Sequence, residues 1–169
     1  MSTVYAEFKR VAARRGDAPF IHVEPVTASA YGIEPGPRTW REVAGEVERL
    51  RTAYANAGYG PGHRVGLLLE NRPAFFTHWL ALNALGISIV PIHEDMRSAE
   101  WGYVIGHSEM VLAVVQPGRE SGLREAASSA NKLLETIRPE VAGRIPDARS
   151  PARGAAQPTV SRATECALL

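Results

Sequence analysis

The chain has 169 residues, 45% of them hydrophobic, and a formal net charge of +1 at pH 7. A chain of this size can bury one core, so we expect one domain or part of a larger one. Acidic and basic residues are mixed along the sequence, which argues against nucleic acid or an anionic membrane as a partner. The single cysteine, Cys166, excludes an internal disulfide and favours a reducing, cytoplasmic location.

The N-terminal segment 1–17 interrupts its apolar residues with charges, unlike a secretory signal. Nowhere does an apolar run reach the ~20 residues that a membrane-spanning helix needs. We therefore predict a protein that is neither exported nor membrane-spanning.

The first part of the chain predicts a short helix, a strand and a loop. Apolar residues recur at helical spacing over 4–12 and Gly16 follows them, which predicts an amphipathic helix with a glycine cap. Residues 20–23 predict a strand. Residues 25–37 are rich in proline, glycine and small polar residues and predict a surface loop.

Thr39 and Glu42 mark the start of the next helix. A threonine followed three residues later by glutamate is a capping box, in which each side chain satisfies a free backbone N–H of the helix start. The apolar stripe of this helix consists of Val43, Val47, Leu50, Tyr54 and Ala57. Gly58 is placed where the helix ends.

Three apolar runs, 65–69, 87–92 and 110–115, lack polar alternation, as strands covered on both faces do. Helices are predicted between them, at 73–85 and 98–107. Strands separated by helices form parallel sheets with right-handed crossovers. The sequence therefore predicts an α/β fold in which these runs are adjacent strands of one parallel sheet with flanking helices.

The last third of the chain changes character. Residues 119–137 predict a helix, whereas the following stretch lacks periodicity and carries four prolines between 138 and 162. We predict three segments: a partial α/β subdomain at 1–139, a linker at 140–162 that proteases cut first, and the start of a strand at 163–169.

Few residues have the context that chemistry requires. Five histidines are scattered without metal-ligand spacing, namely His22, His63, His78, His93 and His107. The run His93-Glu94-Asp95 follows the carboxyl end of a predicted strand, where open α/β sheets usually bind ligands. The alternative is a solvated turn that leads into the helix starting at Ser98, and we favour it.

Other candidates have simpler structural interpretations. His78 and Trp79 could line a ligand cavity, but aromatic residues at helical spacing are more often core. Cys166 lacks a partner base and reads better as a small buried hydrophobe. The only lysines, Lys9 and Lys132, are outside any glycine-rich phosphate loop. The residues alone predict a fold and no reaction.

An ordered set of motifs resembles one enzyme family. Residues 39–43, "TWREV", resemble a "TYREL" motif, and residues 58–65, "GYGPGHRV", resemble "GVGPGDRV". Residues 71–73, "NRP", resemble "NSP", and residues 82–91, "LNALGISIVP", resemble "LKAGAAYVP". In their order and spacing, these motifs together resemble the N-terminal part of the adenylate-forming ligases, or AMP-forming acyl-CoA synthetases. The resemblance covers roughly 3–118 and 163–169.

This resemblance implies the first portion of the large N-terminal domain of such a ligase. The family activates a carboxylic acid with ATP to an acyl-AMP and then transfers the acyl group to coenzyme A. The phosphate loop, the magnesium ligand and the catalytic lysine of the family would follow residue 169. We therefore expect no catalytic residue, no metal site and no cofactor site complete in this chain; ATP, magnesium and coenzyme A belong to the full-length parent.

The resemblance implies one contact with coenzyme A, although the sequence departs from the family pattern at that position. The loop after the "VP" strand often contains an arginine near the coenzyme A phosphates, but here Asp95 takes that position and Arg97 comes two residues later. Arg97 is the predicted contact.

Two interpretations remain open. The chain is either a truncated ligase, inactive alone, or an α/β interaction module that has lost catalysis. An exposed sheet edge at the end of the chain predicts self-association of the truncated form.

Overall fold

The computed structural model describes residues 3–140 and 145–149. Its elements are α1 (Val4–Arg14), β1 (Pro19–Val23), α2 (Pro25–Tyr31), β2 (Gly36–Thr39), α3 (Trp40–Asn56), β3 (Arg64–Leu68), α4 (Pro73–Ala84), β4 (Ser88–Pro91), α5 (Ser98–Ser108), β5 (Leu112–Val115), α6 (Glu120–Ser129) and β6 (Glu135–Ile137).

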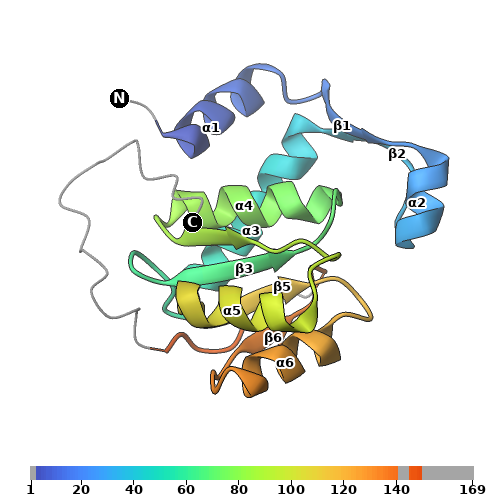
Figure 1. The fold of residues 1–169 in the computed structure, drawn as a ribbon. Coiled ribbons are helices and arrows are strands. Elements are labelled where there is room, and N and C mark those ends of the chain that lie inside the picture. Colours follow the sequence, from blue (N-terminus) through green and yellow to red (C-terminus); the bar gives the residue numbers. More distant parts are fainter. Residues whose placement is uncertain (1–2, 141–144, 150–169) are drawn as a thin grey trace.

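Four strands form a parallel sheet in the order β4-β3-β5-β6. Helices α1, α3 and α4 cover one face, and α5 and α6 cover the other (Figure 1). The predicted α/β class is confirmed, and so is the prediction that the runs at 65–69, 87–92 and 110–115 are adjacent strands. An antiparallel hairpin, β1–β2, lies to one side together with α2.

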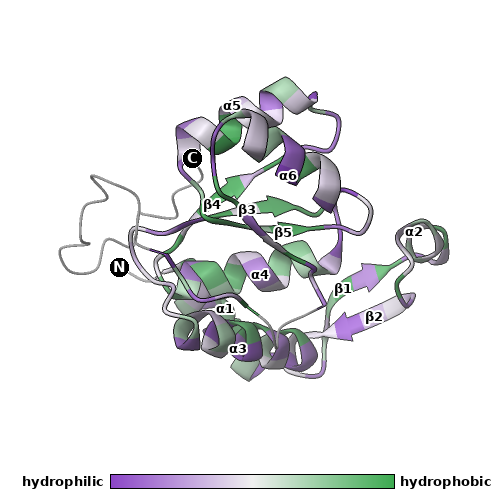
Figure 2. Cartoon of the chain, turned by 90° about the horizontal axis from the view of Figure 1, so that it is seen from below, coloured by the Kyte–Doolittle hydropathy of each residue, from purple (hydrophilic) through white to green (hydrophobic). Residues whose placement is uncertain are grey.

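The central strand β3 explains why the predicted strands lack polar alternation. Leu67 points into the core under α1, α3 and α4, whereas Leu68 points into the core under α5 and α6. Both side chains are fully buried. Apolar residues therefore occupy both faces of the sheet, as Figure 2 shows for the strands between the two helical layers.

Helix α3 begins with the predicted capping box. The hydroxyl of Thr39 accepts a hydrogen bond from the backbone N–H of Glu42 at 3.3 Å, and the backbone N–H of Thr39 donates to Glu42 Oε2 at 2.7 Å. The second bond favours the ionised carboxylate and lowers the pKa of Glu42. The helix start is thus fixed by its own sequence.

Replacing the cap tests this interpretation. Thr39→Ala is expected to lower the free energy of unfolding by about 1 kcal/mol, because a backbone N–H of α3 loses its acceptor. Thr52→Ala, the same substitution at an exposed position inside α3, is the control and should cause no loss. Urea denaturation followed by circular dichroism measures both; equal losses would contradict the role of the cap.

Two predictions of secondary structure are wrong. Residues 25–37 contain α2 and the start of β2 instead of a continuous loop, because Pro25 suits a first helical turn and Gly32 closes the helix at φ 64°. Residues 119–137 are not one helix. Helix α6 ends at Ser129, Asn131 turns the chain at φ 53°, and β6 then pairs with β5.

The predicted linker lies mostly outside the described residues, as do 163–169 and Cys166. Its described part, 145–149, has no regular secondary structure and packs on the core. The N–H of Ala148 donates to Ala57 O at 2.7 Å, and His63 Nε2 lies 2.7 Å from Arg149 O. The boundaries at 139 and 162 and the preferred protease cleavage stay predictions.

Candidate functional site

The chain connections that leave strands β3 and β5 lead in opposite directions across the sheet. From β3 the chain runs through α4 to β4, on one side of the sheet and over one face. From β5 it runs through α6 to β6, on the opposite side and over the other face. The loops after β3 and β5 therefore diverge, and such switch points at the carboxyl ends of strands are where open α/β sheets bind ligands.

Four polar side chains meet at this point, and we call them the switch-point cluster: Glu70, Glu94, Gln116 and Arg119. Gln116 is buried, and its Nε2 donates to Glu70 Oε1 at 2.5 Å and to Glu94 Oε2 at 3.4 Å. Arg119 Nη2 donates to the same oxygen of Glu94 at 3.3 Å. The cluster joins the loops that follow three neighbouring strands, β3, β4 and β5.

The backbone presents Glu70 to the cluster in an unusual way. Glu70 has a φ of 51°, in the left-handed region that non-glycine residues rarely adopt. Such conformations persist only where the surrounding structure determines them, and they are frequent at binding sites. Here the backbone N–H of Gln116 donates to Leu68 O at 2.9 Å, which holds the two loops together beside the turn.

The pKa values of the two carboxyl groups of the cluster are shifted in opposite directions. Burial and a hydrogen bond to Glu94 raise the pKa of Glu70, whereas that same hydrogen bond lowers the pKa of Glu94. The pair thus favours a proton on Glu70 beside an ionised Glu94. A neutral carboxyl next to a carboxylate can exchange a proton or donate a hydrogen bond to a ligand.

The raised pKa of Glu70 predicts how stability changes when this carboxyl group is replaced by one that does not titrate. A carboxyl group with a raised pKa contributes stability below its unfolded pKa and loses it as the pH rises through the folded pKa. Glu70→Gln, which keeps a donor for Glu94, is therefore expected to gain stability relative to the wild type as the pH rises from 4 to 7. Denaturation at pH 4 and pH 7 measures this. No gain at pH 7 relative to pH 4 would contradict a raised pKa of Glu70.

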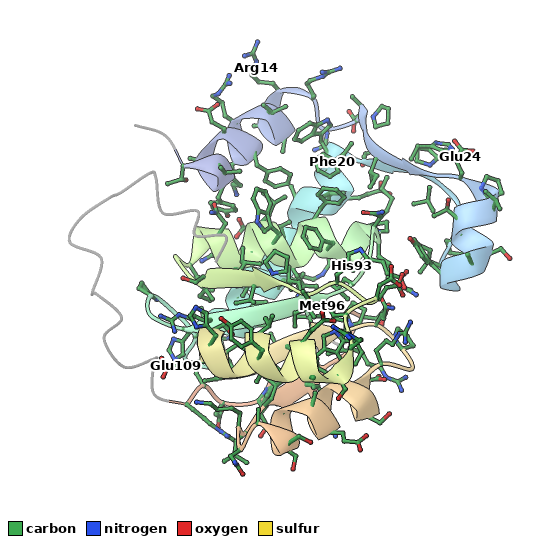
Figure 3. All side chains as sticks on the ribbon, viewed as in Figure 1. Arg14, Phe20, Glu24, His93, Met96 and Glu109 are labelled. Carbon is green, nitrogen blue, oxygen red and sulfur yellow. The ribbon has the colours of Figure 1, made fainter. Side chains whose placement is uncertain are left out.

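The neighbouring residues of the β4 loop are solvated. His93 and Asp95 are exposed, and the N–H of Asp95 donates to His93 Nδ1 at 3.2 Å. Figure 3 labels His93 and Met96 in this loop. The favoured interpretation as a solvated turn holds for His93 and Asp95, whereas Glu94 between them turns into the cluster.

Arg97, the predicted coenzyme A contact, precedes α5 at the same end of the sheet. Its side chain is 84% exposed, and Nη2 forms an ion pair with Glu100 Oε1 at 3.2 Å. The pair raises the pKa of Arg97 further. A phosphate could reach this guanidinium from solvent but would compete with Glu100 for it. The contact stays a prediction.

His78 belongs to the core. Its Nδ1 lies 2.8 Å from the hydroxyl of Tyr54, and its Nε2 lies 3.0 Å from the carbonyl of Pro139. A carbonyl only accepts, so Nε2 carries the proton and Nδ1 accepts from Tyr54. Trp79 packs against the same core. Within the described residues, no group of three or more His, Cys, Asp or Glu side chains is placed to hold a metal ion.

Sequence reasoning missed Glu70, Gln116 and Arg119. Each follows a buried strand closely, so the rule that singled out His93-Glu94-Asp95 would have found them if it had been applied to all three strands. Which of these side chains turn toward one another depends on the loop conformations.

Comparison with known proteins identifies the family. Residues 8–165 match the family model described as "AMP-binding enzyme". The chain belongs to this family. Among curated relatives of the chain, a probable CoA ligase from Humulus lupulus is 29% identical over 107 residues, which are 62% of this chain and 16% of the relative. Long chain acyl-CoA synthetase 1 from Arabidopsis thaliana is 31% identical over 100 residues, 59% of this chain and 15% of the relative.

The chain therefore spans about a sixth of the length of these relatives. A solved benzoate CoA ligase from Burkholderia xenovorans superposes with a TM-score of 0.69 at 18% identity, over 90% of this chain and 30% of that one. At that identity the superposition shows the fold alone, an α/β architecture shared with part of that ligase. Among the described residues, no helix is long and apolar enough to cross a bilayer.

Proposed function

We propose that the protein is the first part of the N-terminal domain of an AMP-forming acid–thiol ligase. The full-length ligase activates a small carboxylic acid with ATP, releases pyrophosphate and transfers the acyl group from acyl-AMP to the thiol of coenzyme A. The observation that carries the proposal is the family match over 8–165, which spans every element of the parallel sheet. The relatives, a probable CoA ligase and a long chain acyl-CoA synthetase, support the reaction class.

The described residues provide a scaffold for this chemistry and no phosphate site. A leaving pyrophosphate needs positive charge, backbone N–H groups and usually magnesium. Lys9 is ion-paired with Glu48 at 3.1 Å, and Lys132 lies in an exposed turn. The carboxylate of Glu94 accepts hydrogen bonds from Gln116 and Arg119, and burial raises the pKa of Glu70 beside it. These residues do not fit a magnesium–nucleotide complex.

The proposal is tested by nucleotide binding. Purified 1–169 is expected neither to bind MgATP in calorimetric titration nor to exchange pyrophosphate with short, medium or long carboxylic acids. The chain extended by the residues that its gene encodes after Leu169 is expected to do both. Saturable MgATP binding by 1–169 would contradict the proposal.

The extended chain also distinguishes the ligase from the alternative function. If the extended chain has neither activity, the protein is an α/β interaction module without catalysis. Within 3–140 and 145–149, strands β4 and β6 are the two outer strands of the sheet, and such edges can pair with another chain. We accordingly propose that 1–169 self-associates, which sedimentation velocity at several concentrations of the same sample measures.

A further inference from the structure

A short segment, residues 145–149, crosses the amino ends of two strands of the sheet, and we call it the strap. It has no regular secondary structure and is the last coloured stretch of the chain in Figure 1. Its partners lie just before β3 and at the start of β6, because His63 precedes Arg64 and Glu135 begins β6. The switch-point cluster follows the opposite ends of the strands, so the strap is separate from the candidate site.

Backbone, charge and apolar contacts hold the strap on the body of the fold. The N–H of Ala148 donates to Ala57 O at 2.7 Å. The guanidinium of Arg149 forms an ion pair with Glu135, with 2.8 Å between Nη2 and Oε1. Ile145 and Ala148 pack against the core under α1, α3 and α4. The strap is therefore attached at both its apolar and its polar residues.

His63 makes the contact that closes the strap. The residue is only 6% exposed, and its Nε2 lies 2.7 Å from the carbonyl oxygen of Arg149. A carbonyl only accepts, so Nε2 carries the proton. Nδ1 then accepts the backbone N–H of Gly60 at 3.1 Å. The neutral imidazole thus has a partner at each ring nitrogen, and the partner of Nε2 is the strap.

A second buried histidine holds the chain before the strap. His78 Nε2 donates to Pro139 O at 3.0 Å, and His78 is only 1% exposed. Pro139 closely follows β6, which is hydrogen-bonded to β5. The strap has no strand partner of this kind. Segments with few contacts open at a lower free energy than the core, so the His63 anchor should release before the His78 anchor.

We propose that the strap is a conformational device that opens and closes locally while the anchor at His78 stays in place. Closed, it holds the chain on the body as far as Arg149. Open, it leaves the chain held only as far as Pro139. Opening therefore lengthens the segment that can move, and this length sets how far the chain after residue 149 can reach from the sheet. The device is independent of the proposed ligase reaction.

Trypsin detects the opening, because the closed strap protects the peptide bond after Arg149. The carbonyl of this bond lies against His63 and the arginine side chain is paired with Glu135, so trypsin can bind neither until the strap opens. Cleavage after Arg149 in wild-type 1–169 is followed by mass spectrometry, and hydrogen exchange of the Ala148 amide by NMR. We expect this amide to be protected, but to exchange faster than that of Leu67 in β3. An unprotected Ala148 amide, or one that exchanges as slowly as Leu67, would overturn the proposal.

Two substitutions at His63 separate its donor from its ring. His63→Phe keeps a ring but loses the donor, and we expect cleavage after Arg149 to become about tenfold faster. His63→Gln keeps an N–H near the position of Nε2 and should stay close to the wild-type rate. His107→Phe, at an exposed histidine, is the matched control and should not change the rate. Equal rates in His63→Phe and the wild type would contradict the closing role of His63.

The second anchor shows whether the opening is local. In His63→Phe, the Nε2–H resonance of His78 is expected to keep its wild-type position and slow exchange with water, because its bond to Pro139 is unaffected. Loss of this resonance together with faster cleavage after Arg149 would mean that the whole domain opens, and the proposal would fail. If His63→Phe does not fold, the wild-type exchange rates of Ala148 and Leu67 decide.

Discussion

Acidification from pH 6.5 to pH 4 is expected to lower the free energy of unfolding by up to about 3 kcal/mol through His78 alone. Burial lowers the pKa of this imidazole to about 4, because the charged form would lose its hydration in the core. Between these pH values the unfolded chain binds a proton that the folded chain does not. Stability is therefore complete above pH 6.5 and falls as the pH decreases toward 4.

His78→Gln separates this effect from other titrations. Glutamine can accept from Tyr54 and donate to Pro139 but does not titrate, so we expect a less stable protein that lacks the loss which His78 causes between pH 6.5 and pH 4. His107→Gln, at an exposed histidine, should keep the wild-type slope. The hydrogen bond with Tyr5 lowers the pKa of Glu48 to about 2. The stability that Glu48 contributes to the fold is therefore lost mainly below pH 4. Denaturation at half-unit pH steps measures the slopes; equal slopes in wild type and His78→Gln would contradict the assignment.

The sequence predicted best those elements whose determinants are local or fully apolar. The capping box at Thr39 fixes the start of α3 through contacts within four residues. The runs that became β3, β4 and β5 are buried on both faces, so composition alone identifies them. Strand β6 was missed because only its pairing with β5 distinguishes the short segment Glu135–Ile137 from a continuing helix. Long-range pairing overrides the local pattern there.

The location of the candidate site could be predicted from the sequence, but the side chains that form it could not. The rule for open α/β sheets places ligands at the carboxyl ends of the strands, and the switch-point cluster lies there. The rule does not say that Glu94 turns inward while His93 and Asp95 face solvent. That choice depends on the left-handed turn at Glu70 and on Gln116, which lies 46 residues further along the chain.

Gly66→Ala in the central strand is expected to destabilise the fold by about 1–3 kcal/mol, because the added methyl group overpacks a filled core. A Cβ at this position would lie 2.8 Å from Met110 Sδ, 3.0 Å from Ile92 Cδ1 and 3.2 Å from Ala113 Cβ. Met110 and Ile92 are buried, so their side chains have little space to move into. Ala113 is paired with Gly66 across β3 and β5, and its Cβ moves only with the backbone.

Gly106→Ala provides the matched substitution with the opposite expected sign. A Cβ at Gly106 would meet no atom within 4 Å, and the residue lies inside α5. Alanine favours the helix over glycine by about 1 kcal/mol, so Gly106→Ala should stabilise the protein. Both variants are compared with the wild type by urea denaturation at pH 7. A stabilised or unchanged Gly66→Ala variant would show that the sheet can separate from α5 and α6 to accept a methyl group, contrary to a close-packed core between them.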